Sequence, residues 1–292
     1  MQVIPFRYFI LLAGTIVSLS LIALIINYTI YQFPGNNYFP PNTPVIACII
    51  LLNYIGMILV FGKNNRVTRS GLELINFFVV MSIIALATNA IQLTPFSPID
   101  KQIIKLEAQW GINMVSILEW INKYQYFKYL LAIIYDTLPY QMSILPLCVI
   151  VSGRFYILKD YYFLLLSTTL LGFTFYYFFP TTAPASEIQN SLFAPEQVAT
   201  GLKFYQIHHY IQPTTIEGGL IALPSFHTIW AILCVYLIKD WFIPCLLLSI
   251  INVLLILSCV LLGWHYPVDI LAAIILVGLS YYLLTLVKVK SR

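Results

Sequence analysis

Charged residues are scarce in this sequence: 9% of its 292 residues are Asp, Glu, Lys or Arg, whereas 60% are hydrophobic. Soluble domains carry roughly 25% charged residues, so the composition excludes a soluble fold of this length. The formal net charge of +4 is too small to indicate a nucleic-acid partner. The composition therefore predicts an integral membrane protein.

Metal-type cysteine spacing is also missing. The five cysteines lie in apolar stretches, none forms a CxxC pair, and their number is odd. This pattern is typical of reduced side chains that fill space in a core or face lipid. The sequence shows no linker, low-complexity segment or internal repeat, which favours a single membrane-embedded unit.

Apolar stretches of about 20 residues, the length of a membrane-spanning helix, occur eight times. We expect the first to be retained rather than cleaved as a signal peptide, because it is long and no small-residue cleavage site follows it. The sequence thus predicts an all-α integral membrane fold of about eight transmembrane helices. The expected spans are roughly residues 8–30, 45–62, 71–93, 128–151, 161–179, 220–238, 242–262 and 268–287.

An even number of spans places both termini on one side of the membrane. That side carries ten Lys and Arg residues and the other side five. By the positive-inside rule, we expect cytoplasmic N and C termini. Between the third and fourth spans, residues 98–124 carry charged and apolar residues at helical spacing, which predicts an interfacial amphipathic helix.

Two polar motifs begin two of the predicted helices on the outer side. LPSFH, residues 223–227, precedes the sixth span, and HYPVD, residues 265–269, precedes the eighth. Pro224 and Pro267 are expected in the first turn of each helix, where a missing N–H is tolerated. Helix N-termini present unpaired N–H groups and a partial positive charge. The two motifs therefore predict an anion site at the outer face.

The histidines of these motifs are candidates for catalysis. His265 and Asp269 are four residues apart, so a helix would put them on one face, where the carboxylate can fix the tautomer of the imidazole. The other nitrogen of His265 would then be free to attack or to carry a proton, with His227 as the complementary acid. A single histidine is more often an interfacial anchor, as we expect for His208 and His209. The presence of two histidines at equivalent helix starts favours a functional site.

These residues resemble the type 2 phosphatidic acid phosphatase superfamily of membrane phosphoryl-transfer enzymes. Its second motif, PSGH, is similar to PSFH at residues 224–227, and its third, SRxxxxxHxxxD, is similar to residues 258–269. The resemblance implies that His265 attacks phosphorus, that Asp269 orients it and that His227 protonates the leaving group. It also implies a lipid phosphate or phospholipid substrate among the membrane lipids, with no cofactor and no metal.

The resemblance covers roughly residues 93–287 and implies a six-helix phosphatidic-acid-phosphatase-like core. We therefore expect an N-terminal three-helix membrane segment at 1–93 and a catalytic membrane domain at 94–292. From the apolar spans and the Lys and Arg count, we expect a multi-pass protein of a bacterial inner (plasma) membrane, with the active site on the extracytoplasmic face.

The cations of the family motifs are missing. When the first motif, KxxxxxxRP, is aligned on Pro180, Gly172 and Phe179 stand where Lys and Arg belong, and Cys259 replaces the Arg of the third motif. This pattern is more similar to the inositolphosphotransferase branch, which includes inositol phosphorylceramide synthase. A site without these cations would lose less binding energy for a phosphodiester, which carries one negative charge, than for a phosphomonoester, which carries nearly two.

Five further residues are candidates for substrate contacts. Hydroxyl groups of the outer face could bond phosphate oxygens, although TTAP at 181–184 also fits a proline-stiffened loop. Lys203 is the only basic residue of the 180–219 loop and is otherwise expected to be a solvated charge. Asp136 lies about two turns inside the fourth span, where an ionisable group is by default functional or paired. The five candidates are Ser225, Thr181, Thr182, Asp136 and Lys203.

The sequence leaves three functions open. The first is a lipid phosphatase or phosphotransferase acting at the outer leaflet through a phosphohistidine. The second is a head-group phosphotransferase of the inositol phosphorylceramide synthase type. The third is a transporter or metal-binding membrane protein, in which two histidines and a carboxylate bind an ion or relay protons.

Overall fold

The computed structural model describes residues 4–290, and every regular element in this range is helical. Six helices are long and apolar enough to cross a membrane, and the chain is therefore a multi-pass membrane protein. They are α1 (Phe6–Ile26, continued by the π-helical turn Asn27–Tyr31), α2 (Thr43–Phe61), α3 (Arg66–Ile91), α8 (Phe155–Phe178), α12 (Phe242–Leu261) and α13 (Pro267–Lys290).

Two of the eight predicted spans take a different form. The fourth is broken into α6 (Gln125–Tyr135) and α7 (Leu138–Ser152), which are bent by 42°. The sixth is α11 (Phe226–Leu237), whose 12 residues are too few to cross a membrane as a straight helix. The structure thus has six long spans, or seven if the bent pair crosses as one, and eight crossings remain a prediction.

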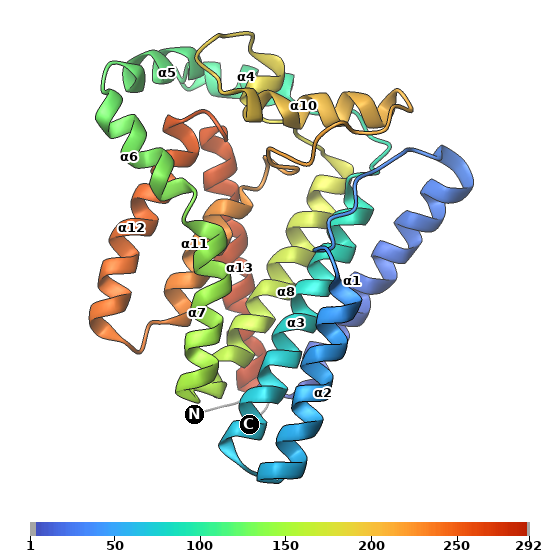
Figure 1. Cartoon of the computed structure of the whole chain (residues 1–292). Helices are drawn as coiled ribbons and strands as arrows, with labels where there is room; N and C mark the ends of the chain where they lie inside the picture. The colour runs from blue at the N-terminus through green and yellow to red at the C-terminus, as the bar shows by residue number, and fades with distance from the viewer. Residues whose placement is uncertain (1–3, 291–292) are drawn as a thin grey trace.

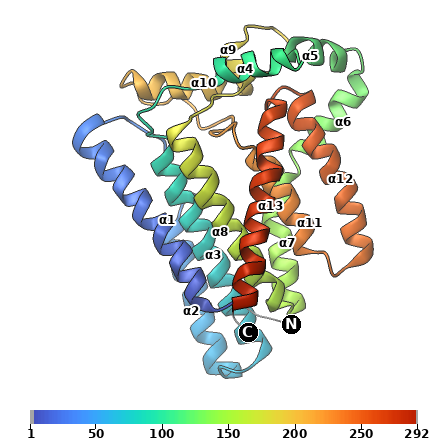
Figure 2. The same cartoon turned by 180° about the vertical axis from the view of Figure 1, so that it is seen from behind.

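The long helices run between two ends of the molecule, and both described termini lie at the same end (Figure 1). We name this the terminal end. The short helices α4 (Asp100–Gln109), α5 (Met114–Asn122), α9 (Pro184–Glu187) and α10 (Pro195–His208) lie across the opposite end, which we name the capped end (Figure 2). Helices α11 and α13 both run from the capped end toward the terminal end, as the sequence predicts.

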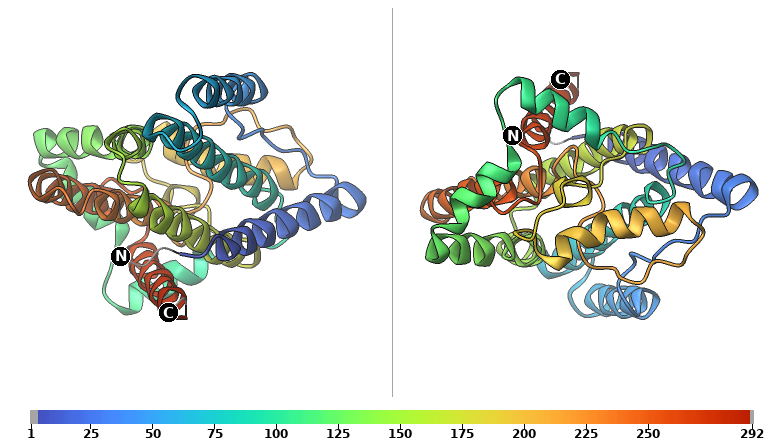
Figure 3. Two further views of the ribbon diagram at one scale, coloured as in Figure 1. Left: turned by 90° about the horizontal axis from the view of Figure 1, so that it is seen from below. Right: turned by 90° about the horizontal axis from the view of Figure 1, so that it is seen from above.

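The amphipathic segment expected at 98–124 forms two helices rather than one. Gly111 has a positive φ of 73°, a conformation that a helix cannot continue and that glycine adopts without strain. The side chain of Asn113 then accepts hydrogen bonds from the backbone N–H groups of Val115 and Ser116 and starts α5. The turn lets the cap curve around one side of the bundle while α10 crosses its centre (Figure 3).

Helix α8 forms the centre of the bundle. Leu164, Leu165 and Leu166 are buried although they point in different directions, because α1, α3, α7, α11 and α13 all pack against α8. None of the residues of α2 is buried, as expected for a helix surrounded by lipid. Since α1 and α3 pack directly on α8, the N-terminal helices share the core with the motif-bearing helices.

Candidate active site

The two predicted motifs lie together near the capped end. His227 is in the first turn of α11, and His265 is in the turn between α12 and α13. The centroids of their imidazole rings are 5.6 Å apart, and the rings are inclined at 61°. The backbone N–H of Ser225 donates a hydrogen bond of 3.2 Å to the carbonyl of Asp269, which ties the two motifs together.

One nitrogen of His265 is held by two acceptors. Its Nδ1 lies 3.0 Å from the carbonyl oxygen of Ala222 and 3.3 Å from Oδ2 of Asp269. A carbonyl oxygen can only accept, so Nδ1 carries the hydrogen and Nε2 keeps its lone pair. Burial lowers the pKa of His265 to about 4, so the ring is neutral at pH 7. This is the protonation state that a nucleophilic imidazole requires.

Asp269 is buried and uses one oxygen for two bonds. Besides His265, its Oδ2 accepts a 2.9 Å hydrogen bond from the backbone N–H of Tyr266, at the start of α13. The carboxylate thus caps its own helix and orients the histidine four residues before it. The spacing predicts the bond to His265. The carbonyl of Ala222 has no signal in the sequence, because any residue supplies a backbone oxygen.

His227 is positioned by an aromatic residue that no sequence motif predicts. Tyr135 of α6 stacks on the His227 ring with centroids 4.5 Å apart, and its hydroxyl oxygen lies 3.5 Å from His227 Nδ1. The other face of Tyr135 stacks on Trp264 at 5.1 Å. Aromatic residues make up 15% of the chain, so a single tyrosine is not distinctive in the sequence. The three stacked rings fix the side of the site that faces α6.

Ser225 is the N-cap of α11. Its Oγ accepts hydrogen bonds from the backbone N–H of Thr228 at 3.3 Å and from the Thr228 hydroxyl at 3.2 Å. Pro267 is the first residue of α13, as predicted, whereas Pro224 precedes the cap of α11 and lies outside its first turn. Its expected place in a helical turn was therefore wrong, because the serine after it takes the capping position.

The positions of the missing cations are filled by apolar packing. Gly172 of α8 faces Phe226, and a Cβ added to Gly172 would lie 2.7 Å from Cζ of that ring. Phe226 thus occupies the space that a lysine at position 172 would need. Cys259 is buried in α12, and Phe179 is exposed at the end of α8. The sequence departs from the family motifs at both positions: glycine replaces lysine at 172, and phenylalanine replaces glycine at 226. These two replacements contact each other.

Thr181 and Thr182 are buried and bonded within the protein. Oγ1 of Thr181 accepts a 2.8 Å hydrogen bond from the N–H of Leu223. The N–H and the hydroxyl of Thr182 donate to Oδ2 of Asp100 at 2.8 and 3.2 Å. Burial raises the pKa of Asp100 to about 7. Thr181 thus ties the loop after α8 to the first residue of motif LPSFH, and Thr182 ties the same loop to α4; their predicted contact with phosphate stays a prediction.

Lys203 is buried in the cap, so the expectation of a solvated charge was wrong. Its Nζ donates hydrogen bonds to the carbonyls of Glu217, Gly218 and Ile216 at 2.6, 3.3 and 3.4 Å. Burial lowers its pKa to about 8. The loop at 216–218 folds over the side chain of α10, an arrangement with no local sequence signal. These bonds give no support to a contact between Lys203 and phosphate.

Asp136 ends α6 at the bend before α7 and is exposed. It lines a pocket of about 420 Å³ between α6, the end of α12 and the 192–197 segment. The pocket also includes Lys128, Tyr135 and Trp264, so it adjoins the stacked aromatic rings of the site. Asp136 thus shares a pocket with Tyr135, the residue that stacks on His227, whereas Lys203 lies elsewhere in the cap.

The donor groups within residues 4–290 do not include three His, Cys, Asp or Glu side chains close enough together to hold a metal ion.

Comparison with known proteins gives one match. Searches of curated proteins and of solved structures return no match. A family model described as the PAP2 superfamily matches residues 101–283, which is more than half of the chain and includes both histidines and Asp269. Membership of this superfamily suggests a membrane lipid phosphatase-type function. The chain belongs to the PAP2 superfamily.

Proposed function

We propose that this protein is a membrane enzyme that transfers the phosphoryl group of a lipid phosphate or phosphodiester through a phosphohistidine on His265, at the outer leaflet. The observation that carries the proposal is the pair of acceptors on Nδ1 of His265, which leaves Nε2 as the free nucleophile.

In the proposed reaction, Nε2 of His265 attacks phosphorus and the bond between phosphorus and the leaving oxygen breaks. The leaving oxygen takes a proton from His227, whose ring centroid lies 5.6 Å from that of His265. The Ala222 carbonyl and Asp269 stabilise the positive charge that develops on His265. The N-termini of α11 and α13 supply N–H groups to the phosphoryl oxygens. Water or an acceptor hydroxyl then attacks phosphorus and releases His265.

A head-group phosphotransferase is the second candidate, and the apolar packing at Gly172, Phe226 and Cys259 favours it. A monoester with nearly two negative charges would meet no cation at these positions, whereas a diester brings a single charge. A metal-binding transporter is less well supported, because the Asp269 carboxylate is already bonded to His265 and to the N-terminus of its helix.

The proposal is tested by trapping acid-labile phosphate on the protein with a labelled lipid substrate. His265→Ala should remove both turnover and the adduct. His227→Ala should slow turnover by about 10²–10⁴-fold, the usual contribution of a positioned acid, yet still form an adduct from a substrate with a good leaving group. Asp269→Asn should fall between them, because the Ala222 carbonyl still holds Nδ1.

The trapping result assigns the roles. An adduct that persists in His265→Ala and disappears in His227→Ala would reverse the assignment of nucleophile and acid. If rapid quenching finds no adduct in the parent protein during turnover, direct attack by water replaces the covalent mechanism.

A further inference from the structure

The pocket beside Tyr135 is larger than hydrolysis requires. Its volume of about 420 Å³ is room for more than ten water molecules at about 30 Å³ each, whereas hydrolysis of a phosphohistidine uses one. Tyr129, Tyr135 and Trp264 supply aromatic walls, and Gln125 adds an amide. Such a mixture of apolar walls and a few polar groups is typical of a small-molecule site.

The pocket joins the catalytic histidines through one residue. Tyr135 lines the pocket, stacks on His227 and places its hydroxyl oxygen 3.5 Å from His227 Nδ1. A ligand in the pocket would therefore lie on the His227 side of the phosphoryl position, where His227 exchanges a proton with the leaving or attacking oxygen. This is the side on which the alcohol portion of a phosphate ester belongs.

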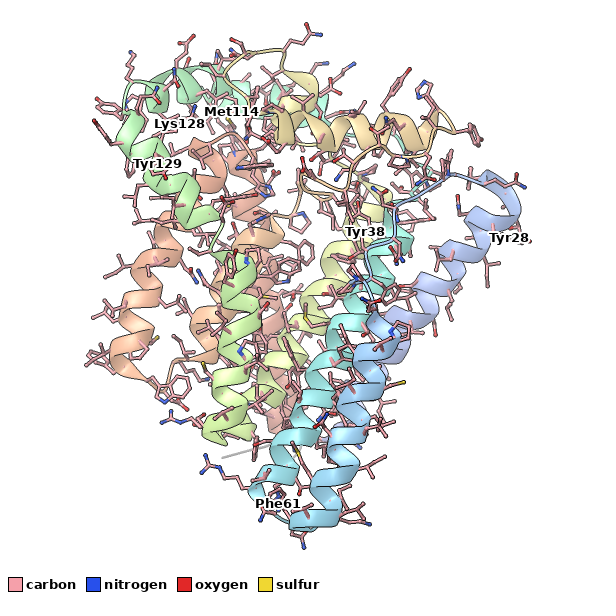
Figure 4. The ribbon with its side chains drawn as sticks, viewed as in Figure 1. Tyr28, Tyr38, Phe61, Met114, Lys128 and Tyr129 are labelled. Carbon is pink, nitrogen blue, oxygen red and sulfur yellow. The ribbon has the colours of Figure 1, made fainter. Side chains whose placement is uncertain are left out.

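Two opposite charges stand at the two ends of the pocket. Lys128 and Asp136 are eight residues apart along α6, a rise of about 12 Å, too far for an ion pair with each other. The Lys128 ammonium donates to Oδ1 of Asn122 at 3.3 Å and keeps further hydrogens for another acceptor. No described side chain donates a hydrogen bond to the Asp136 carboxylate. Figure 4 shows Lys128 and Tyr129 on α6 near the capped end.

The depth of Asp136 in the membrane depends on how α6 and α7 cross it. Helix α7 has 15 residues below the bend, a length of about 22 Å, which is less than the about 30 Å thickness of the hydrocarbon region. If α6 and α7 cross the membrane as one bent span, Asp136 lies within that thickness. A carboxylate there is expected to have a polar partner. A ligand that donates hydrogen bonds would supply it.

We propose that this pocket is the head-group subsite of the enzyme and takes a hydroxylated head group, with Asp136 and Lys128 as its specificity residues. Hydroxyl groups can donate hydrogen bonds to Asp136 and also accept them from Lys128. An ammonium head group can only donate, so it can bond Asp136 but not Lys128. This inference rests on the proposed function, since it assigns the head-group side of the same phosphodiester. In the transfer step, the head-group oxygen bonds to phosphorus, the phosphorus–Nε2 bond of His265 breaks, and the proton of the hydroxyl passes to His227.

The subsite is tested by binding, so that turnover is not needed. Purified full-length His265→Ala protein is titrated with the methyl phosphodiester of glycerol, the methyl phosphodiester of ethanolamine and dimethyl phosphate, and binding is measured by calorimetry. We expect the glycerol diester to bind most tightly. Asp136→Asn and Lys128→Met should each weaken its binding roughly ten- to a hundredfold, the loss expected for a hydrogen bond to a charged group, and leave the binding of dimethyl phosphate within about twofold.

Matched controls are Glu119→Gln and Lys105→Met, which remove similar charges from exposed positions of the cap outside the pocket lining. Equal binding of the glycerol diester and dimethyl phosphate, or no binding of either, would overturn the subsite. Tighter binding of the ethanolamine diester would overturn the hydroxylated class. Because phosphoenzyme trapping measures the proposed function separately, failure of one experiment does not imply failure of the other.

Discussion

Phe226 and Gly172 show how a single contact can remove a charge from an active site. The ring of Phe226 packs over Gly172 and contacts Phe173, with the two ring centroids 4.8 Å apart. Because a side chain at position 172 would collide with this ring, the phenylalanine of motif PSFH and the glycine of α8 require each other. In the proposed reaction, the phosphate would be neutralised by helix N-termini and backbone N–H groups, because Phe226 leaves no space for a lysine at position 172.

This coupling predicts that Gly172→Ala destabilises the protein, although alanine is usually the better helix residue. The new Cβ would lie 2.7 Å from Cζ of Phe226, and overpacking of this kind costs about 1–3 kcal/mol. Combining it with Phe226→Leu should recover part of the loss, which a double-mutant cycle of unfolding in detergent would measure. Gly278→Ala is the matched control, since nothing lies within 4 Å of its added Cβ. Additive effects of the two changes would contradict the coupling.

Residue roles that depend on short spacings could be predicted from the sequence. His265 and Asp269 share a helix start, so four residues of separation were enough to predict their contact. Ala222, Tyr135 and Asp100 were not predictable, because their roles depend on packing between segments distant in the sequence. Lys203 was interpreted wrongly for the same reason: the loop that covers it is set by tertiary structure.

Helix α4 connects the cap to both sides of the site. Asp100 and Glu107 are seven residues apart, two helical turns, so their side chains project from one face. Asp100 accepts hydrogen bonds from Thr182 in the loop after α8. Glu107 accepts a 2.9 Å hydrogen bond from the N–H of Val268 in the first turn of α13. The cap therefore positions the loop before His227 and the helix start after His265.

The buried carboxylate of Asp100 predicts a pH dependence of stability. Burial raises its pKa from 3.8 to about 7, so between these values the folded protein binds more protons than the unfolded chain. This group should lower the unfolding free energy as pH rises from about 4 to 7, with a slope approaching about 1.4 kcal/mol per pH unit. Asp100→Asn keeps an acceptor for Thr182 and should remove that slope.

Unfolding in detergent, followed from pH 4 to 8, compares the parent and Asp100→Asn proteins. The difference between the two free energies should favour the variant increasingly as pH rises. Glu119→Gln, an exposed carboxyl of α5, serves as the control for the general effect of removing one charge. Parallel pH profiles for the parent and Asp100→Asn would show that Asp100 does not titrate in this range.

Helix positions were more predictable than helix continuity. Each apolar stretch of the sequence corresponds to helical structure, because periodicity and length are local properties. The sequence did not predict the bend between α6 and α7, which lies where Tyr135 and Asp136 line the pocket. It also did not predict that α11 is short, with Ser225 as the cap of a helix that starts at the site. Both breaks occur where the chain turns toward the candidate active site.

The two ends of the whole molecule differ in basic residues. Nine Lys and Arg residues of the described part of the chain lie toward the terminal end, in α1, the α2–α3 turn, the start of α8, the α11–α12 turn and the end of α13, whereas the capped end carries five lysines. In Figure 4, Phe61 marks the α2–α3 turn at the terminal end, opposite Met114 of the cap. The positive-inside rule therefore predicts that the capped end, with the candidate active site, faces away from the cytoplasm.

The orientation is tested with a membrane-impermeant thiol reagent on intact cells, after replacement of the five native cysteines. Lys123→Cys, exposed between α5 and α6, should be labelled, and Lys63→Cys should be labelled only after permeabilisation. Position 203 is unsuitable as a probe because its side chain is buried. Labelling of position 63 but not of position 123 in intact cells would show that the orientation in the membrane is the opposite of the one predicted.

The cap has a consequence for kinetics. Helices α4, α5 and α10 lie across the capped end of the bundle, whereas α6 and α12 expose apolar side chains at the sides. A substrate anchored in the bilayer would arrive by lateral diffusion within the leaflet. Its effective concentration is then a surface density, and the rate should follow the mole fraction of substrate in the membrane. Diluting the substrate with inert lipid would slow the enzyme, whereas adding buffer would not.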